Sequence, residues 1–192
     1  MKNIVVMLFV IISLQPLSAF SDTDDEIWKK LRDGGLVVLM RHASVDRGDS
    51  LVRDPGCLKE SMLSEKGKAQ AARVGELFRS MRVNISQVLS SPYCRTTDTA
   101  KIAFGQAQAV AFLSLLEGLA ENEVEENTEW LAKTIGAYTG SDNLVLVTHA
   151  PNISTVSFET VEKAAFVVFQ PLANQEFEEL GKISPEKNNQ FK

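Results

Sequence analysis

The chain has 192 residues, of which 44% are hydrophobic and 23% are charged. This composition is typical of one globular domain with a hydrophobic core, and it excludes a disordered or fibrous chain. The formal net charge of −5 excludes long-range attraction to nucleic acids or to anionic membranes, so an anionic substrate needs a local cluster of cations.

The first 21 residues have the pattern of a secretory signal peptide. Lys2 precedes an apolar run from Ile4 to Leu14, and small residues follow it. The run is short for a membrane span. Cleavage is expected after Ala19 or Ser21, and it leaves a periplasmic or secreted protein without an integral membrane span. A buried N-terminal strand or an uncleaved anchor is the alternative.

Helices and strands are then expected to alternate. Thr23 and Glu26 form a capping box that begins a short helix, and Gly34-Gly35 ends it. Leu36 to Met40 is a compact apolar run, as in a strand buried on both faces. Residues 41–63 show no periodicity and contain Gly and Pro, so they are predicted to form a long functional or mobile loop.

The rest of the chain continues this alternation. The further expected elements are a helix from Ser64 through Met81, a strand at Ile85–Leu89, a helix from Ser91-Pro92 to Phe104, a strand at Ala109–Leu116, a helix over about 122–138, and strands at Asn143–Val147 and Ala164–Phe169. This order implies right-handed crossovers, so the predicted fold class is α/β, with a mostly parallel central sheet and helices on both faces. Residues 22–180 are expected to form a single domain, followed by a polar, frayed tail at 181–192.

Both histidines of the chain directly follow a predicted buried strand. His42 comes after Met40 and Arg41, and His149 comes after Val147 and Thr148. In open parallel sheets, ligands bind outside the carboxyl ends of the strands. Both imidazoles are therefore expected to open onto one crevice.

Arg95 is predicted to lie at the same edge of the sheet. It falls in the first turn of the helix that follows Pro92, where free backbone N–H groups and the helix dipole favour an anion. Its planar guanidinium matches the geometry of phosphate oxygens. Together with Arg41, it predicts a local anion site in an acidic protein.

Four segments resemble, in order, the motifs of the histidine phosphatase superfamily, the phosphoglycerate mutase-like proteins. They are Leu39–Ala43, Leu63–Gln70, Leu89–Thr96 and Val145–Ala150. The similarity extends over residues 34–169. The stretch between Arg95 and His149 is brief, and in this the chain resembles the short exported branch rather than the glycolytic mutases.

The resemblance implies a covalent mechanism without a metal or another cofactor. His42 would attack phosphorus and form a phosphohistidine, while Arg41, Arg95 and His149 hold the phosphoryl oxygens. A backbone carbonyl bonded to the other ring nitrogen of His42 would fix its neutral tautomer.

The general acid and the remaining substrate contacts are less defined. Glu117 stands where many members of the superfamily carry their acid, with Glu162 as the competitor and a solvated loop glutamate as the alternative. Ser44 is expected to contact the phosphate, and Asp46 and Arg47, just after His42, are candidates for contacts with the substrate, with solvated loop residues as the alternative. Ala43 replaces the usual glycine, and Val45 stands where a threonine hydroxyl often lies near the phosphate.

The two cysteines, Cys57 and Cys94, are expected to form a disulfide because the chain is predicted to be exported, although two free buried thiols are the alternative. Such a bridge would brace the loop after His42 against the helix that carries Arg95.

Together these features predict a metal-independent phosphomonoester hydrolase. Its substrate would be a phosphorylated small molecule or an envelope sugar outside the cytoplasm; the sugar rests on a resemblance to lipopolysaccharide core heptose phosphatases. A catalytically silent phosphate-binding module is the main alternative. A two-histidine metalloenzyme is disfavoured because no other histidine, and no Asp or Glu at a recognised ligand spacing, is present.

Overall fold

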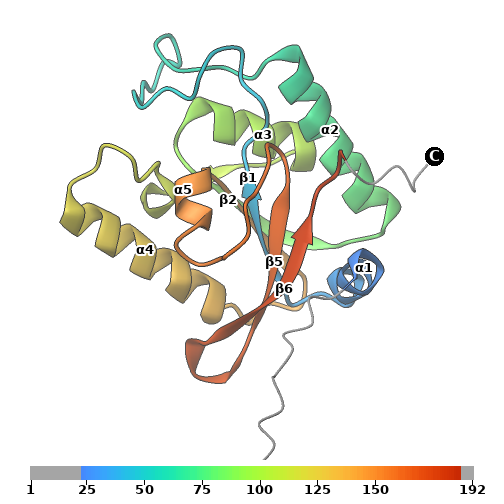
Figure 1. Ribbon diagram of the computed structural model, residues 1–192. Coiled ribbons are helices and arrows are strands. Elements are labelled where there is room, and N and C mark those ends of the chain that lie inside the picture. The colour runs from blue at the N-terminus through green and yellow to red at the C-terminus, as the bar shows by residue number, and fades with distance from the viewer. Residues whose placement is uncertain (1–22, 187–192) are drawn as a thin grey trace, which may run out of the picture.

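A computed structural model describes residues 23–186, so the predicted signal peptide lies outside the described residues. The strands are Val37–Arg41 (β1), Ile85–Ser90 (β2), Gln108–Ala109 (β3), Asn143–Thr148 (β4), Phe166–Pro171 (β5) and Phe177–Ile183 (β6). They form one six-stranded sheet in the order β3-β2-β4-β1-β5-β6 (Figure 1). Strands β1 to β4 are mutually parallel, whereas β5 is antiparallel to its neighbours β1 and β6. The prediction of an α/β fold with a mostly parallel sheet is confirmed.

The helices cover both faces of the sheet, as predicted. They are Asp24–Asp33 (α1), Glu65–Ser80 (α2), Cys94–Phe104 (α3), Glu121–Gly136 (α4) and Ala150–Ile153 (α5), with short 3-10 turns at Ala111–Leu113 and Ala173–Gln175. Helices α1, α2 and α3 lie on one face, and α4 and α5 on the other (Figure 1). The described part of the chain has no helix long and apolar enough to cross a membrane.

The first and second helices begin where the sequence predicts. Thr23 and Glu26 form the expected capping box on α1. The Ser64 hydroxyl accepts a hydrogen bond from the Gly67 N–H at the start of α2. Gly105 ends α3 in the left-handed conformation, at φ 75°, which glycine adopts without a Cβ clash.

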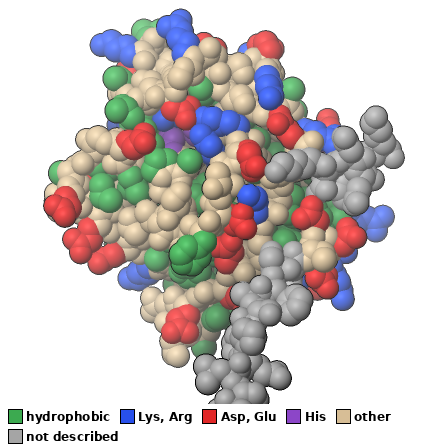
Figure 2. Space-filling view, viewed as in Figure 1, with side chains coloured by type: hydrophobic (Ala, Val, Ile, Leu, Met, Phe, Trp, Pro, Cys, Tyr) green, Lys and Arg blue, Asp and Glu red, His purple; other side chains and the backbone are tan. Residues whose placement is uncertain are grey.

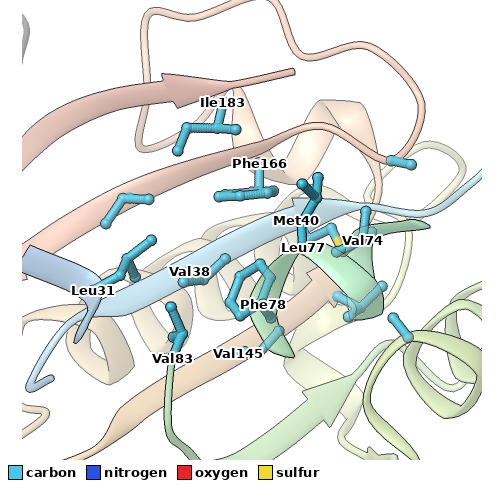
Figure 3. Close-up of a cluster of buried hydrophobic side chains, with 14 of the residues drawn as sticks. Leu31, Val38, Met40, Val74, Leu77, Phe78, Val83, Val145, Phe166 and Ile183 are labelled. Carbon is cyan, nitrogen blue, oxygen red and sulfur yellow. The ribbon is translucent and has the colours of Figure 1, made fainter. Parts of the chain in front are cut away.

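The sheet separates two hydrophobic clusters, and the side chains of β1 alternate between them. Val38 and Met40 pack with α1, α2 and α3, while Val37 and Leu39 face α4 and α5. Figure 3 shows the first cluster, in which Val38 and Met40 point toward Phe78 and Phe166. The apolar run of β1 is therefore buried on both faces, as its composition predicts.

Two element predictions need correction. The strand expected at Ala109–Leu116 is only two residues long, because the chain leaves the sheet after Val110 donates its last backbone bond to Ser90. It then turns so that Leu113 and Leu115 enter the core, and this turn brings Glu117 to the end of the sheet. The polar, frayed tail expected over 181–192 is wrong for its first residues, since β6 runs through the buried Ile183, and residues 187–192 lie outside the described residues.

Candidate active site

The two histidines lie side by side because their strands are neighbours. Strands β1 and β4 pair in parallel with Arg41 opposite Thr148, and the His42 N–H donates to the Thr148 carbonyl at 2.9 Å. The imidazole centroids are 5.3 Å apart, and each histidine is only 1% exposed. The predicted crevice at the carboxyl edge of the sheet thus brings the two rings together.

Hydrogen bonding fixes the tautomer of His42. Its Nδ1 lies 2.8 Å from the Ala43 carbonyl oxygen, which can only accept, so Nδ1 carries the proton and Nε2 keeps its lone pair. Burial, and then the nearby Lys163 ammonium, lower the pKa of His42 to about 3. His42 is therefore neutral at ordinary pH, with Nε2 available as a nucleophile.

His149 is held in the opposite tautomer. The Arg95 Nη2 group, which can only donate, lies 3.2 Å from its Nδ1, and the Ser91 hydroxyl lies 2.8 Å from its Nε2. Nδ1 is therefore the acceptor, and Nε2–H donates to Ser91. Burial, followed by His42 and Arg95, holds the pKa of His149 well below its usual value.

Both arginines have N–H groups left over for an anion. Arg95 is 0% exposed and packs against the Tyr93 ring, yet its Nε and Nη1 have no hydrogen-bond partner among the described residues. Arg41 donates through Nη1 to the Val161 carbonyl at 2.9 Å, and its Nε is likewise unpartnered. Burial lowers the pKa of Arg95. Unpaired buried donors are costly, which is the pattern expected of an anion-binding site.

The first turn of α3 differs from the prediction. The Cys94 N–H donates at 2.7 Å to Glu60, a carboxylate from the loop after His42, so it is not free to bind phosphate. Glu60 also accepts from the Asp54 N–H at 2.8 Å. The expected disulfide joins Cys57 to Cys94, and the alternative of free thiols is wrong. The helix N-terminus therefore anchors the loop, while the Arg95 side chain faces the crevice.

A cavity of about 310 Å³ opens beside these groups. It is lined by Arg41, Asp49, Arg95, Leu115, Glu117, His149, Ala150, Pro151 and Ser154. In Figure 2 the small purple histidine surface lies between blue cationic and red acidic side chains. The cavity has room for a phosphoryl group and part of a leaving group.

The two candidates for the general acid, Glu117 and Glu162, lie in different places. Glu117 is exposed to solvent and lines the same cavity as Arg41, Arg95 and His149. Glu162 instead accepts from the Ser184 hydroxyl at 3.1 Å and faces β6. Of the two carboxylates, only Glu117 is brought to the crevice.

The family of the chain follows from its sequence and agrees with this geometry. Residues 37–137 match the model of the histidine phosphatase superfamily (branch 1). The chain belongs to the histidine phosphatase superfamily. No curated protein matches it individually.

Several solved structures share the fold of this chain. The protein histidine phosphatase SixA, complexed with tungstate, is 15% identical; the similarity covers 79% of this chain and 98% of that one, with a TM-score of 0.58. YhfR of Bacillus stearothermophilus is 15% identical, with 78% and 98% covered and a TM-score of 0.59. A mutant phosphoserine phosphatase of Entamoeba histolytica, in complex with phosphoserine, is 13% identical, with 80% and 98% covered and a TM-score of 0.60. At these identities the comparison establishes the fold.

The superfamily motifs of the chain account for only part of the surroundings of His42. Ser44 and Arg47 line a neighbouring cavity rather than the one beside Arg95, and Val45 bridges to Leu63. The Ala43 N–H is held by the Thr99 hydroxyl of α3 at 3.1 Å. The contacts of Ser44 and Arg47 with phosphate remain a prediction.

Sequence reasoning missed two charged residues that lie beside His42. Asp49 lies 3.8 Å from His42 Nε2, and the Lys163 Nζ lies 3.4 Å from the same nitrogen. Neither belongs to a recognisable motif: one is in an aperiodic loop and the other just precedes β5. Residues 23–186 contain no cluster of three His, Cys, Asp or Glu side chains arranged to ligate a metal.

Proposed function

We propose that the chain hydrolyses phosphomonoesters through a phosphohistidine at His42, without a metal. One observation carries this proposal: the neutral His42 imidazole lies beside His149, and the buried Arg95 and the partly buried Arg41 have N–H groups without a partner among the described residues. An activated nucleophile next to donors that match phosphoryl oxygens is the arrangement that covalent phosphoryl transfer needs.

The reaction proceeds in two displacements. The Nε2 lone pair of His42 attacks phosphorus in line, a P–N bond forms, and the P–O bond to the leaving group breaks. Arg41, Arg95 and the neutral His149 surround the phosphoryl oxygens, and Glu117 donates a proton to the leaving oxygen. A water molecule then attacks phosphorus, returns a proton to Glu117, and releases phosphate and free His42.

The test is hydrolysis of p-nitrophenyl phosphate by the mature protein. The wild type is expected to release phosphate in excess EDTA, whereas His42→Ala is inactive and Glu117→Gln is slowed about 10²-fold or more. Rapid acid-free quenching with radiolabelled substrate should trap one phosphate per active chain on wild type and none on His42→Ala. Loss of activity in EDTA, or full activity in His42→Ala, contradicts the proposal.

A catalytically silent phosphate-binding module is the second candidate, and the Lys163 ammonium beside His42 is the observation that favours it. Its Nζ lies 3.4 Å from Nε2 of His42, and an ammonium that donates to this nitrogen occupies the attacking lone pair while still attracting phosphate. The same assay separates the two functions. A module binds inorganic phosphate in a calorimeter but shows neither turnover nor a labelled phosphohistidine.

We further propose that the protein works outside the cytoplasm on a phosphorylated small molecule or envelope sugar. The N-terminal sequence pattern and the Cys57–Cys94 disulfide support export to an oxidising compartment. Cell fractionation with N-terminal sequencing should find a shortened chain outside the cytoplasm. A phosphatase screen over sugar phosphates, phosphoamino acids and nucleotides, with His42→Ala as the blank, identifies the substrate class.

A further inference from the structure

Lys163 and Asp49 form an ion pair beside the nitrogen that would attack phosphorus. The Lys163 Nζ donates to both Asp49 oxygens, at 2.7 and 2.6 Å, and lies 3.4 Å from His42 Nε2. Asp49 also lies 3.6 Å from Arg41 Nη2. The carboxylate thus contacts three of the groups that surround the reacting position.

The backbone holds Lys163 in this place. The next residue, Ala164, donates its N–H to the His42 carbonyl at 3.3 Å, so Lys163 is tied to the nucleophile by a main-chain bond. Ala164 is buried and has a φ of 64°, in the left-handed region that an alanine adopts at an energetic cost. Strained backbone of this kind is found where a side chain must be aimed at a functional position.

Asp49 and a reacting phosphoryl group need the same space. In-line attack requires the phosphorus atom about 3–3.5 Å from Nε2, and an Asp49 oxygen already lies 3.8 Å from that nitrogen. Burial raises the pKa of the Asp49 carboxyl, but the hydrogen bond from Lys163 and the nearby Arg95 hold that pKa below its usual value, so Asp49 is an anion. Two anions in contact with one cluster of cations repel each other, so one must leave.

We propose that Lys163 is a ligand of the reacting phosphoryl group, and that Asp49 is an internal anion which holds Lys163 until substrate phosphate displaces it. This inference rests on the proposed function. It adds a third cation to the two arginines of the superfamily motifs. Lys163 thereby supplies a contact on the side of the crevice where Val45 has no hydroxyl.

Asp49 borders a second cavity into which its side chain can move. Its side chain lines two cavities: the one that contains Arg95 and His149, and a second of about 320 Å³ lined by Ser44, Val45, Arg47, Gly48 and Lys163. A rotation of the Asp49 side chain moves the carboxylate from the first cavity toward Arg47 in the second. Arg47 is then the partner that receives Asp49 rather than a direct phosphate ligand.

The test is the binding of inorganic phosphate to the full chain, measured by isothermal titration calorimetry. Asp49→Asn is expected to bind phosphate about tenfold more tightly, and Lys163→Met about tenfold more weakly, as expected for one charge-assisted hydrogen bond. Asp33→Asn removes the same charge from an exposed position at the end of α1, and Lys66→Met removes an exposed lysine. Both controls should stay within about twofold of wild type. Thermal unfolding of each variant without phosphate checks that it is folded.

The two substitutions must also be coupled. In the wild type, Lys163→Met removes a phosphate ligand but also removes the cation that holds the competing Asp49 carboxylate in the site. Easier displacement of Asp49 therefore offsets part of the loss of phosphate affinity. Lys163→Met should therefore cost more phosphate affinity in the Asp49→Asn background than in the wild type. Equal costs in both backgrounds overturn the displacement of Asp49, and unchanged affinity in Lys163→Met overturns its role as a phosphate ligand.

Turnover separates this inference from the proposed function. If the wild type hydrolyses no phosphomonoester but the phosphate affinities change as stated, the hydrolase proposal fails and the assignment of Lys163 and Asp49 stands. If hydrolysis depends on His42 but neither substitution changes the phosphate affinity, the hydrolase proposal stands and the assignment of Lys163 and Asp49 fails. A loss of kcat in Asp49→Asn with unchanged phosphate affinity makes Asp49 a proton donor and overturns the internal anion.

Discussion

At the scale of single residues, the site keeps two imidazoles neutral while surrounding them with cations. Each ring has one nitrogen whose role is fixed by a partner that can only accept or only donate: the Ala43 carbonyl for His42 and the Arg95 guanidinium for His149. Protonation of either ring would place another positive charge in a buried cationic crevice. The Nε and Nη1 groups of Arg95 and the Nε group of Arg41, which have no partner among the described residues, thus remain available to an anion.

Arg95 should be more important for activity than for stability. Arg95→Met is expected to lower kcat/KM at least 10²-fold, because a buried bidentate donor to the phosphoryl oxygens is lost. The free energy of unfolding should stay within about 1 kcal/mol of wild type or rise, since a buried charge with unpartnered N–H groups is replaced by an apolar side chain of similar length. Urea unfolding and phosphatase kinetics measure the two effects.

Arg79→Met is the matched control because Arg79 is an exposed arginine on α2, and it should change neither quantity. A destabilisation of about 3 kcal/mol or more in Arg95→Met would show instead that Arg95 is mainly a structural residue.

At the scale of elements, the loop from His42 to Leu63 is attached to the helices on either side of it. The Cys57–Cys94 disulfide and the Glu60 carboxylate both join it to the first turn of α3. At its other end, the Ser44 carbonyl accepts from the backbone and side chain of Ser64, at the start of α2. A loop with so little regular structure is thereby held close to the His42 side chain.

Removing the disulfide should loosen this attachment without unfolding the domain. The bridge spans a sequence separation of 37 residues, for which loop entropy predicts a stabilisation of about 4 kcal/mol at most. We expect the Cys57→Ser, Cys94→Ser double variant to have a lower free energy of unfolding and faster amide exchange over residues 46–60. A reducing agent should lower the wild type to the level of the double variant and leave the double variant unchanged; no effect on the wild type would speak against the bridge.

Gly67 allows α2 to approach the loop after His42 closely. A Cβ at this position would lie 1.9 Å from the Ser44 carbonyl oxygen, a backbone atom that cannot rotate away. Gly67→Ala should therefore destabilise the fold by about 1–3 kcal/mol and lower kcat at least tenfold, since Ser44 lies two residues from His42.

Thermal unfolding and kinetics test the effect of Gly67→Ala. Gly56→Ala, where the added Cβ meets no atom closer than 3.8 Å, is the control. Equal stability and equal kcat of the two variants would mean that the loop moves away from the added Cβ without affecting the fold or the activity.

At the scale of the whole molecule, the sequence predicts the scaffold well and the charged surroundings poorly. Buried apolar runs and strand-end histidines are local patterns, so β1, β4 and the meeting of His42 with His149 could be predicted from them. The pairing of Asp49 with Lys163 joins residues 114 positions apart, and no periodicity or motif encodes it. The early end of β3 could not be predicted either. The segment from Val110 to Leu116 is mostly apolar, and this composition fits both a strand and a turn whose side chains enter the core.

The pH dependence of stability should report on both histidines, the only two in the chain. Their folded-state pKa values lie below the unfolded value near 6.5, so the unfolded chain binds protons first as the pH falls. The stabilisation is complete above pH 6.5 and is lost progressively below it, down to about pH 3 for His42. Between pH 6 and 5 the slope should approach about 1.4 kcal/mol per pH unit for each histidine.

Urea unfolding at pH 7, 6 and 5 measures this slope, and His42→Gln should make it shallower. The same slope in the variant and the wild type would show that His42 is protonated in the folded protein.

The pairing of β1 with β4 affects how the sequence of such a chain can diverge during evolution. The spacing of the two imidazoles depends on a ladder of main-chain hydrogen bonds between Val37–Arg41 and Leu144–Thr148, and not on the length of chain that separates them. Insertions or deletions between residues 105 and 142 can therefore change the mouth of the crevice, the position of Glu117 included, while the two imidazoles keep their spacing. The part of the crevice away from the histidines is thus free to diverge among related chains.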